Sequence, residues 1–155
     1  MTMTKQSKLQ ITTPAEREIR AERIFDAPRD RVWAAMTDAK LIAQWWGRGR
    51  PTIVEVYEPR RGGRWRFVTE GQGFEGKIRE LTPKERIVQT FEWDGMPGHV
   101  IVETMTLEDL GDGRTRLRTV SLFHTTEERD GMLHSGMEQG MGESYDALDK
   151  LLANL

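Results

Sequence analysis

One acidic residue in an expected strand is the first candidate for chemistry in this sequence. Within residues 101–107, Glu103 alternates in step with Ile101, Met105 and Leu107, so these side chains would share one face of a strand. A carboxylate on an apolar face is unfavourable unless it is paired or protonated, and burial raises its pKa. Glu103 is therefore a candidate general acid or base. The alternatives are a place at the open end of the sheet or an ion pair with an arginine, and a register shift of one residue would turn Glu103 outward.

The histidines give weaker signals. His99 shares the expected strand face of Glu103, but the rise along a strand separates the two by about 13 Å, too far to share a metal directly. His134 and Glu138 are one helical turn apart, yet a zinc site usually needs three or four ligands. His124 follows the last expected strand and lies either in solvent or at the mouth of a cavity. The sequence has no cysteine and no nucleophile triad, phosphate-binding loop or metal cluster, so we expect no metal and no cofactor.

The strands that would position these side chains follow from alternating hydrophobicity. Residues 17–25 place Ile19, Ala21, Arg23 and Phe25 on one face of a strand. Further strands are expected at 52–57, 64–70, 73–81, 86–93, 99–109 and 113–123. Short turns rich in glycine and proline separate them, which favours an antiparallel meander.

Helical spacing predicts two short helices after the first strand and a long helix at the C-terminus. Pro28 suits the first helical position of the first helix, and Asp38 suits the cap of the second. Thr125 has capping-box spacing and begins a helix that runs to about Ala153, with Gly131 as the candidate break. Strands grouped between helices indicate an α+β fold.

Length and charge narrow the function classes. The chain has 155 residues, of which 31% are charged, as is typical of a single soluble domain; we expect that domain over residues 16–155. The net charge of −2 argues against nucleic-acid and membrane partners. The polar N-terminus lacks a signal-peptide pattern, and no run reaches the roughly 20 apolar residues of a membrane span, so a cytoplasmic location is expected. Residues 1–15 are predicted to form a flexible tail, although "LQIT" is a candidate edge strand.

An arginine-rich segment, "PRRGGRWRF" at residues 59–67, combines basic side chains with an aromatic one. These are ingredients of nucleic-acid binding. The paired glycines Gly62 and Gly63 favour a hairpin turn over a nucleic-acid-binding segment, with the arginines on a solvated edge.

The stretch "SGMEQGMGES" places three glycines and two methionines in the expected C-terminal helix. An interior glycine weakens a helix by about 0.5–1 kcal/mol relative to alanine. A long twisted sheet curls, so one helix on its concave face leaves room for a cavity. Met137 and Met141, beside Gly136 and Gly140, suit the wall of such a cavity because methionine adapts to irregular space. The alternative is close packing, in which the glycines admit a strand or loop.

Side chains alternate between the two faces of a strand, and this strand parity selects the side chains that would face the helix. This set is rich in aromatic side chains and methionine and contains few polar groups, which is the composition of small-molecule sites; the alternative is an ordinary core. Of the two adjacent tryptophans, Trp46 is placed nearer the rim of the cavity. The candidate ligand-binding residues are Trp46, Trp65, Phe67, Phe74, Ile78, Phe91, Trp93, Glu103, Met105, Thr119, Ser121, Phe123, Met137 and Met141.

Several segments resemble one branch of the START-like, or helix-grip, superfamily of polyketide cyclases and lipid-transport proteins. They are "FDAPRDRVWAAMTDAKLIAQWWG", "GGRWRF", "ELTPKERIVQTFEW", "EDLGDGRTRL" and the C-terminal helix. The branch is named for homologues of the activator of heat-shock protein 90 ATPase, and the resemblance covers residues 16–153. It implies a seven-stranded antiparallel sheet that grips a long C-terminal helix, with an apolar cavity between them.

Three function classes follow from these expectations. A module that binds an apolar or aromatic small molecule, for sensing, carriage or sequestration, is favoured because no catalytic motif is visible. An enzyme of cyclase, lyase or hydrolase type is the alternative, and a perturbed carboxylate inside the cavity would favour it. A chaperone-associated interaction module is the second alternative; the eukaryotic activator carries an additional N-terminal domain for which this chain has no room. A homodimer is compatible with the sequence.

Overall fold

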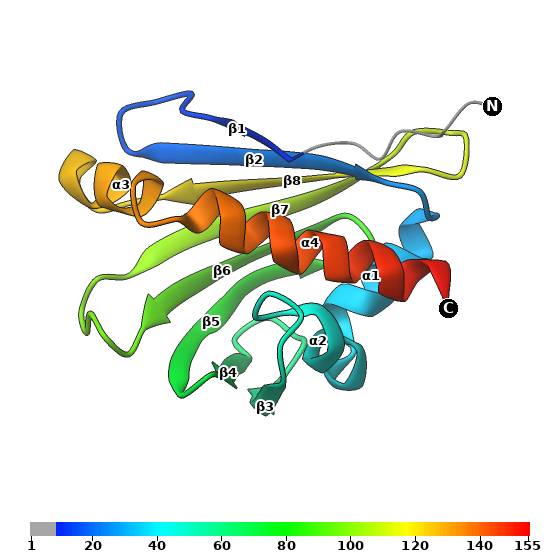
Figure 1. Cartoon of the computed structure of the whole chain (residues 1–155), viewed down its shortest axis with the longest axis horizontal. Coiled ribbons are helices and arrows are strands. Elements are labelled where there is room, and N and C mark those ends of the chain that lie inside the picture. The colour runs from blue at the N-terminus through cyan, green and yellow to red at the C-terminus, as the bar shows by residue number, and fades with distance from the viewer. Residues whose placement is uncertain (1–8) are drawn as a thin grey trace.

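An antiparallel sheet of eight strands wraps around the C-terminal helix in the computed structural model, which describes residues 9–155 (Figure 1). In chain order the elements are β1 (Gln10–Thr12), β2 (Glu18–Phe25), α1 (Arg29–Thr37), α2 (Ala39–Trp45), β3 (Thr52–Tyr57), β4 (Arg64–Thr69), β5 (Gln72–Thr82), β6 (Arg86–Trp93), β7 (Ile101–Asp109), β8 (Thr115–Leu122), α3 (Thr126–Leu133) and α4 (Met137–Ala153). The strand order is β1-β2-β8-β7-β6-β5-β4-β3. The strands from β3 to β8 therefore form the expected meander, and the fold is α+β.

The N-terminal part of the sheet corrects two expectations. The sheet has eight strands rather than seven, because β1 pairs with β2 in the register Ile11↔Ala21. The predicted flexible tail of residues 1–15 is thus wrong at Gln10–Thr12, and the alternative of an edge strand in "LQIT" is right; residues 1–8 lie outside the described part of the chain. The physical reason is that the free edge of β2 offers unpaired backbone groups to any extended neighbour.

The C-terminal helix is broken at a different glycine from the one expected. Gly131 lies within α3, whereas Gly136 precedes α4 with φ of +88°, in the left-handed region that favours glycine. The single long helix predicted from Thr125 to Ala153 is therefore two helices, with residues 134–136 between them. Helical periodicity persists through this stretch, so the pattern alone gave no sign of the break.

Side-chain caps begin two of the helices as the sequence predicts. The Asp38 carboxylate accepts a hydrogen bond of 2.8 Å from the Lys40 N–H at the start of α2. Thr125 Oγ1 accepts one of 3.1 Å from the Glu128 N–H at the start of α3. Pro28 is the N-cap of α1 and not its first helical residue. These caps satisfy N–H groups that have no partner inside the helix.

The C-terminal half of α4 closes one end of the core. Tyr145, Leu148 and Leu152 are buried in a hydrophobic cluster with residues of β2, α1 and α2. Arg23 of β2 is 4% exposed and holds α4 through Asp149 at 2.7 Å and Asp146 at 2.9 Å. The sheet and α4 are thus joined by both apolar packing and a buried ion pair. No helix in residues 9–155 is long and apolar enough to cross a membrane.

Candidate functional site

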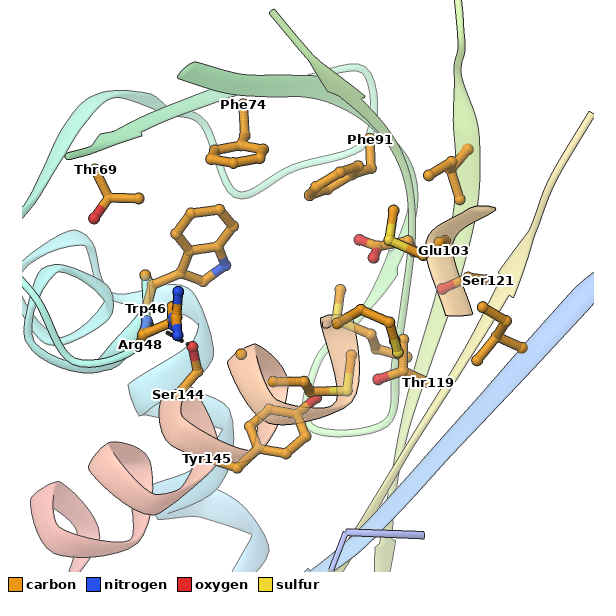
Figure 2. A pocket seen from close by; sticks show the side chains of 18 of the residues that line it. Trp46, Arg48, Thr69, Phe74, Phe91, Glu103, Thr119, Ser121, Ser144 and Tyr145 are labelled. Atoms are coloured by element: carbon orange, nitrogen blue, oxygen red, sulfur yellow. Dashed lines mark hydrogen bonds between the residues drawn. The ribbon is translucent and has the colours of Figure 1, made fainter. Parts of the chain in front are cut away.

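A cavity of about 350 Å³ lies between the curved sheet and the N-terminal half of α4 (Figure 2). Strands β4 to β8 and β2 supply one side, α4 and α3 supply the opposite side, and the segment after α2 closes one end. Leu148 and Leu152 fill the space further along α4, whereas Met137 and Met141 reach into the open part. The size and position are those of a small-molecule site.

Aromatic rings form the wall of the cavity nearest to α2. Trp46 packs with its ring centroid 5.3 Å from that of Phe74 and 6.4 Å from that of Trp65. Phe91 lies 5.5 Å from Phe74 and 5.9 Å from Trp65. Figure 2 shows Trp46, Phe74 and Phe91 facing the open space. These edge-to-face and tilted contacts hold the rings in place, so the wall is formed before any ligand binds.

The position of Trp46 is set by the short helix that precedes it. The Trp45 indole N–H donates to the Ala35 carbonyl at 2.9 Å, which fixes α2 against α1. Gly47 follows with φ of +70°, and a Cβ there would lie 2.6 Å from Thr69 Oγ1. Only glycine lets the chain turn and approach β4 so closely. Both tryptophans line the cavity as a result.

The glycines of α4 leave space rather than admit a neighbour. A Cβ at Gly136 or Gly142 would meet nothing within 4 Å, and one at Gly140 would meet only the Arg48 side chain at 3.8 Å. The close-packing alternative for these glycines is therefore wrong. Gly140 lines the cavity between Met137 and Met141, as expected of a wall with little side-chain bulk.

A polar row crosses the apolar sheet surface at the floor of the cavity. Gln89 of β6, Glu103 of β7 and Ser121 of β8 are direct cross-strand partners, and Ile78 and Ile19 continue the row on either side. Gln89 Nε2 donates to Glu103 Oε1 at 3.4 Å. The cavity thus presents three adjacent polar side chains on a largely apolar sheet face.

Glu103 is the titratable group of this row. Burial raises its pKa to about 7, and the single hydrogen bond from Gln89 opposes that shift only in part. Its remaining accessible surface faces the cavity. Thr119 Oγ1 is buried beside the row, next to the Tyr145 hydroxyl. Burial also raises the pKa of Tyr145 to about 12, so this phenol stays neutral.

Charged side chains at the rim are already paired. Arg48 Nε lies 2.6 Å from Glu143 Oε1, and the Arg48 N–H donates to Ser144 Oγ at 2.8 Å. Glu70 pairs with Arg50 at 2.7 Å. The rim is therefore polar and exposed, while the interior is apolar except for the row around Glu103.

Most of the candidate ligand-binding residues line this cavity. They are Trp46, Trp65, Phe74, Phe91, Glu103, Met105, Thr119, Ser121, Phe123, Met137 and Met141. Gln89 lines it too, on the face that parity assigned. Lining residues that the sequence reasoning missed include Trp45, Arg48, Thr69, Ser144 and Tyr145. Two of them gave a signal, because Tyr145 stood beside the apolar stripe of the helix and Thr69 shares the inward strand face of Trp65 and Phe67. Arg48 gave none, because a loop brings it there.

Three candidate residues do not line the cavity. Phe67 faces inward but is covered by Trp46, with ring centroids 5.1 Å apart. Ile78 is 1% exposed and belongs to the filled core. Trp93 is 37% exposed at the end of β6, where its indole N–H donates to Gln72 Oε1 at 2.8 Å. Alternation along a strand predicts which side chains point inward. It does not predict which of them border the cavity, which are covered by other side chains and which lie beyond the helix.

The histidines and the arginines of the arginine-rich segment, the other candidates for chemistry, lie outside the cavity. His99 Nδ1 lies 2.9 Å from Glu128 Oε1, and none of the three histidines lines the cavity. No cluster of metal-ligating side chains occurs within the described part of the chain. Arg66, in the arginine-rich segment, lies within 3 Å of carboxylate oxygens of Glu55, Glu75 and Asp94. The charge of that arginine is therefore balanced by neighbouring carboxylates on and beside the sheet.

Comparisons with known proteins agree with this architecture. The sequence profile of the family described as Activator of Hsp90 ATPase homolog 1-like protein matches residues 26–153. A crystal structure from Rhodobacter sphaeroides is 30% identical, with a TM-score of 0.85, and the match covers 96% of this chain and 99% of that one. A structure from Arthrobacter aurescens is 24% identical, with a TM-score of 0.84 and coverage of 94% and 92%. None of the curated proteins compared by sequence matches significantly.

Proposed function

This chain belongs to the family of Activator of Hsp90 ATPase homolog 1-like proteins, within the START-like superfamily, and from that premise we propose that it binds a small apolar or aromatic molecule. The binding site is the cavity between the sheet and α4. The observation that carries the proposal is the cavity itself, of about 350 Å³, with preformed aromatic walls and few polar groups. Ligand pockets of soluble proteins have this size and composition.

The composition of the wall supports an apolar or aromatic ligand in particular. Trp46, Phe74 and Phe91 offer ring faces and edges, and Met137 and Met141 offer flexible side chains that can adjust to a ligand's outline. Burial of such a ligand removes apolar surface from water on both partners, which is the main favourable term in binding.

Thermal shift and native mass spectrometry test the proposal with a panel of fatty acids, polyketide-like aromatics and other hydrophobic metabolites. A ligand at 100 times its Kd stabilises the folded state by about 2.7 kcal/mol, which raises the Tm of a protein of this size by about 5–10 °C. The substitution Met141→Trp fills the cavity and should abolish both the shift and the mass-spectrometric complex. Met96→Trp is the matched control, because Met96 is 44% exposed outside the cavity and the substitution should leave binding intact.

The outcome decides between function classes. A dose-dependent shift that Met141→Trp removes and Met96→Trp retains supports a small-molecule site. If no compound binds the wild-type protein, the proposal fails, and a protein partner such as a chaperone becomes the class to pursue.

A second candidate is an enzyme of cyclase, lyase or hydrolase type, and Glu103 favours it. A carboxyl group whose pKa lies near 7 inside a cavity can take up and release a proton at neutral pH. The test is prolonged incubation of any bound compound with wild type and Glu103→Gln, followed by mass spectrometry of the small molecule. Product from the wild type alone supports catalysis; an unchanged compound in both supports binding only.

A further inference from the structure

Within residues 9–155, the carboxyl group of Glu103 has no positively charged partner. Among residues 9–155, the ionisable side chains that line the cavity are Glu103, Arg48, Glu70 and Tyr145. Arg48 is held by Glu143 at the rim, and Tyr145 is neutral. The side chains that face Glu103 from neighbouring strands are Gln89 and Ser121, which carry no charge.

Arg23 of β2, the buried arginine that contacts α4, is also held elsewhere. It is bound to Asp149 and Asp146 of α4, at 2.7 and 2.9 Å. A carboxylate at the cavity floor would therefore stay uncompensated, although buried charges in folded proteins are normally paired.

The wall opposite this carboxyl group suits a positive charge as well as an apolar body. Trp46, Trp65, Phe74 and Phe91 pack with centroids 5.3–6.4 Å apart and line the same cavity. The faces of aromatic rings attract cations, and tryptophan does so most strongly. Figure 2 shows Glu103 and Ser121 on one side of the open space, Trp46 and Phe74 on the other, and Phe91 between Phe74 and Glu103. One small molecule in the cavity would contact both groups.

From this arrangement we infer that the cavity selects organic cations: amines with an aromatic or apolar body, whose ammonium group is held by Glu103 and whose body packs on the rings of Trp46, Phe74 and Phe91. The inference rests on the proposed function and names its ligand class. Gln89 and Ser121 supply oxygen acceptors beside the carboxylate for the remaining N–H groups of the ammonium.

Proton release is a distinctive consequence. A bound cation favours the ionised form of Glu103 and lowers its pKa. Because that pKa is about 7 in the free protein, an amine that binds at pH 7 should displace about half a proton per ligand. Affinity should fall as the pH drops below 7, since the carboxyl group must then lose its proton for the cation to bind.

Three probes with one ring system test the inference: naphthylmethylamine, naphthalenemethanol and naphthoate, all with the same ring attachment. Isothermal titration calorimetry at pH 7, in two buffers of different ionisation enthalpy, measures affinity and protons released. The amine should bind the wild type about tenfold or more tightly than the alcohol, because hydrogen bonds to a charged group are the stronger ones. Naphthoate should bind least, since it would bring a second negative charge to Glu103.

Two variants locate the effect. Glu103→Gln keeps the size and hydrogen-bonding groups of the side chain and removes the charge, so it should lose the preference for the amine and the proton release. Glu108→Gln is the matched control, because Glu108 lies on the same strand, exposed on the opposite face and paired with Arg116. It removes the same charge from the protein and should leave the preference unchanged. Circular dichroism confirms that both variants are folded.

The results separate this inference from the function on which it rests. If the alcohol or naphthoate binds as tightly as the amine, or if Glu103→Gln keeps the amine preference, the cation inference is overturned while a small-molecule site stands. If none of the three probes binds, the cation inference is overturned, and a negative result with the wider panel would remove the proposed function too.

Discussion

Replacement of Glu103 by glutamine is expected to stabilise the folded protein at neutral and alkaline pH and to leave its stability unchanged in acid. The pKa of this carboxyl group is about 7 in the folded protein against an ordinary value of 4.5, because burial disfavours the charged form. The folded state therefore binds more protons than the unfolded state between these two values. By linkage, the free energy of unfolding falls as the pH rises from about 4.5 to about 7 and then levels off.

The size of the effect follows from the same two values. The difference between 4.5 and about 7 corresponds to about 3 kcal/mol at any pH above both. Water that enters the cavity would solvate the carboxylate and reduce this figure, so we expect about 1–3 kcal/mol of added stability for Glu103→Gln at pH 8. At pH 4 the glutamate is protonated in the folded state and mostly protonated in the unfolded state, and glutamine is close to it in shape and polarity. The difference there should approach zero.

Urea unfolding of the wild type, Glu103→Gln and Glu108→Gln at several pH values between 4 and 8 measures this dependence. The exposed control should change stability by less than about 0.5 kcal/mol throughout. A carbon NMR titration of the Glu103 carboxyl group gives its pKa directly. A stability difference that is the same at every pH, or a titration midpoint near 4.5, would refute the account of a desolvated carboxyl group facing the cavity.

Two further predictions concern α4 and its attachment to the sheet. Gly136→Ala should destabilise the protein by about 1–2 kcal/mol because residue 136 has φ of +88°. Gly142→Ala should stabilise it by about 0.5–1 kcal/mol because Gly142 lies within the helix with open space around its Cα. Urea unfolding should therefore show changes of opposite sign in the free energy of unfolding, and changes of the same sign would contradict the position of the break. Arg23→Ala should lower the free energy of unfolding by about 3–5 kcal/mol in the same assay, because it leaves Asp149 partly buried without its cation. A decrease below about 1 kcal/mol would show that the ion pair is not buried in solution.

The polar row shows what the alternation of side chains along a strand can and cannot predict. Alternation placed Gln89, Glu103, Thr119 and Ser121 on inward faces, and the structure has all four in the cavity lining. The alignment of Gln89, Glu103 and Ser121 into one row was not predictable, because it depends on the registers of β6 with β7 and β7 with β8. Those registers are set by turns and by packing across the whole sheet.

The aromatic candidates show the opposite case. Trp93, Phe67 and Phe74 have the same status in the sequence, as aromatic side chains on inward faces. Only Phe74 lines the cavity, because Trp46 covers Phe67 and the end of β6 carries Trp93 into solvent. The differences arise from the segment after α2, which places Trp46 over Phe67, and from where β6 ends, and the alternation within a strand specifies neither.

By itself the sequence determined the element order, the α+β class, the caps at Asp38 and Thr125 and the inward faces of the strands, because each depends on neighbours within a few residues. Tertiary structure decided the eighth strand, the break at Gly136, the extent of the open cavity and the separation of the Glu103 carboxyl group from the cations of the described chain, residues 9–155. These depend on how tightly the sheet curls and where α2 and α4 lie against it. Such placement results from many contacts between distant parts of the chain, and the local periodicity of the sequence does not predict it.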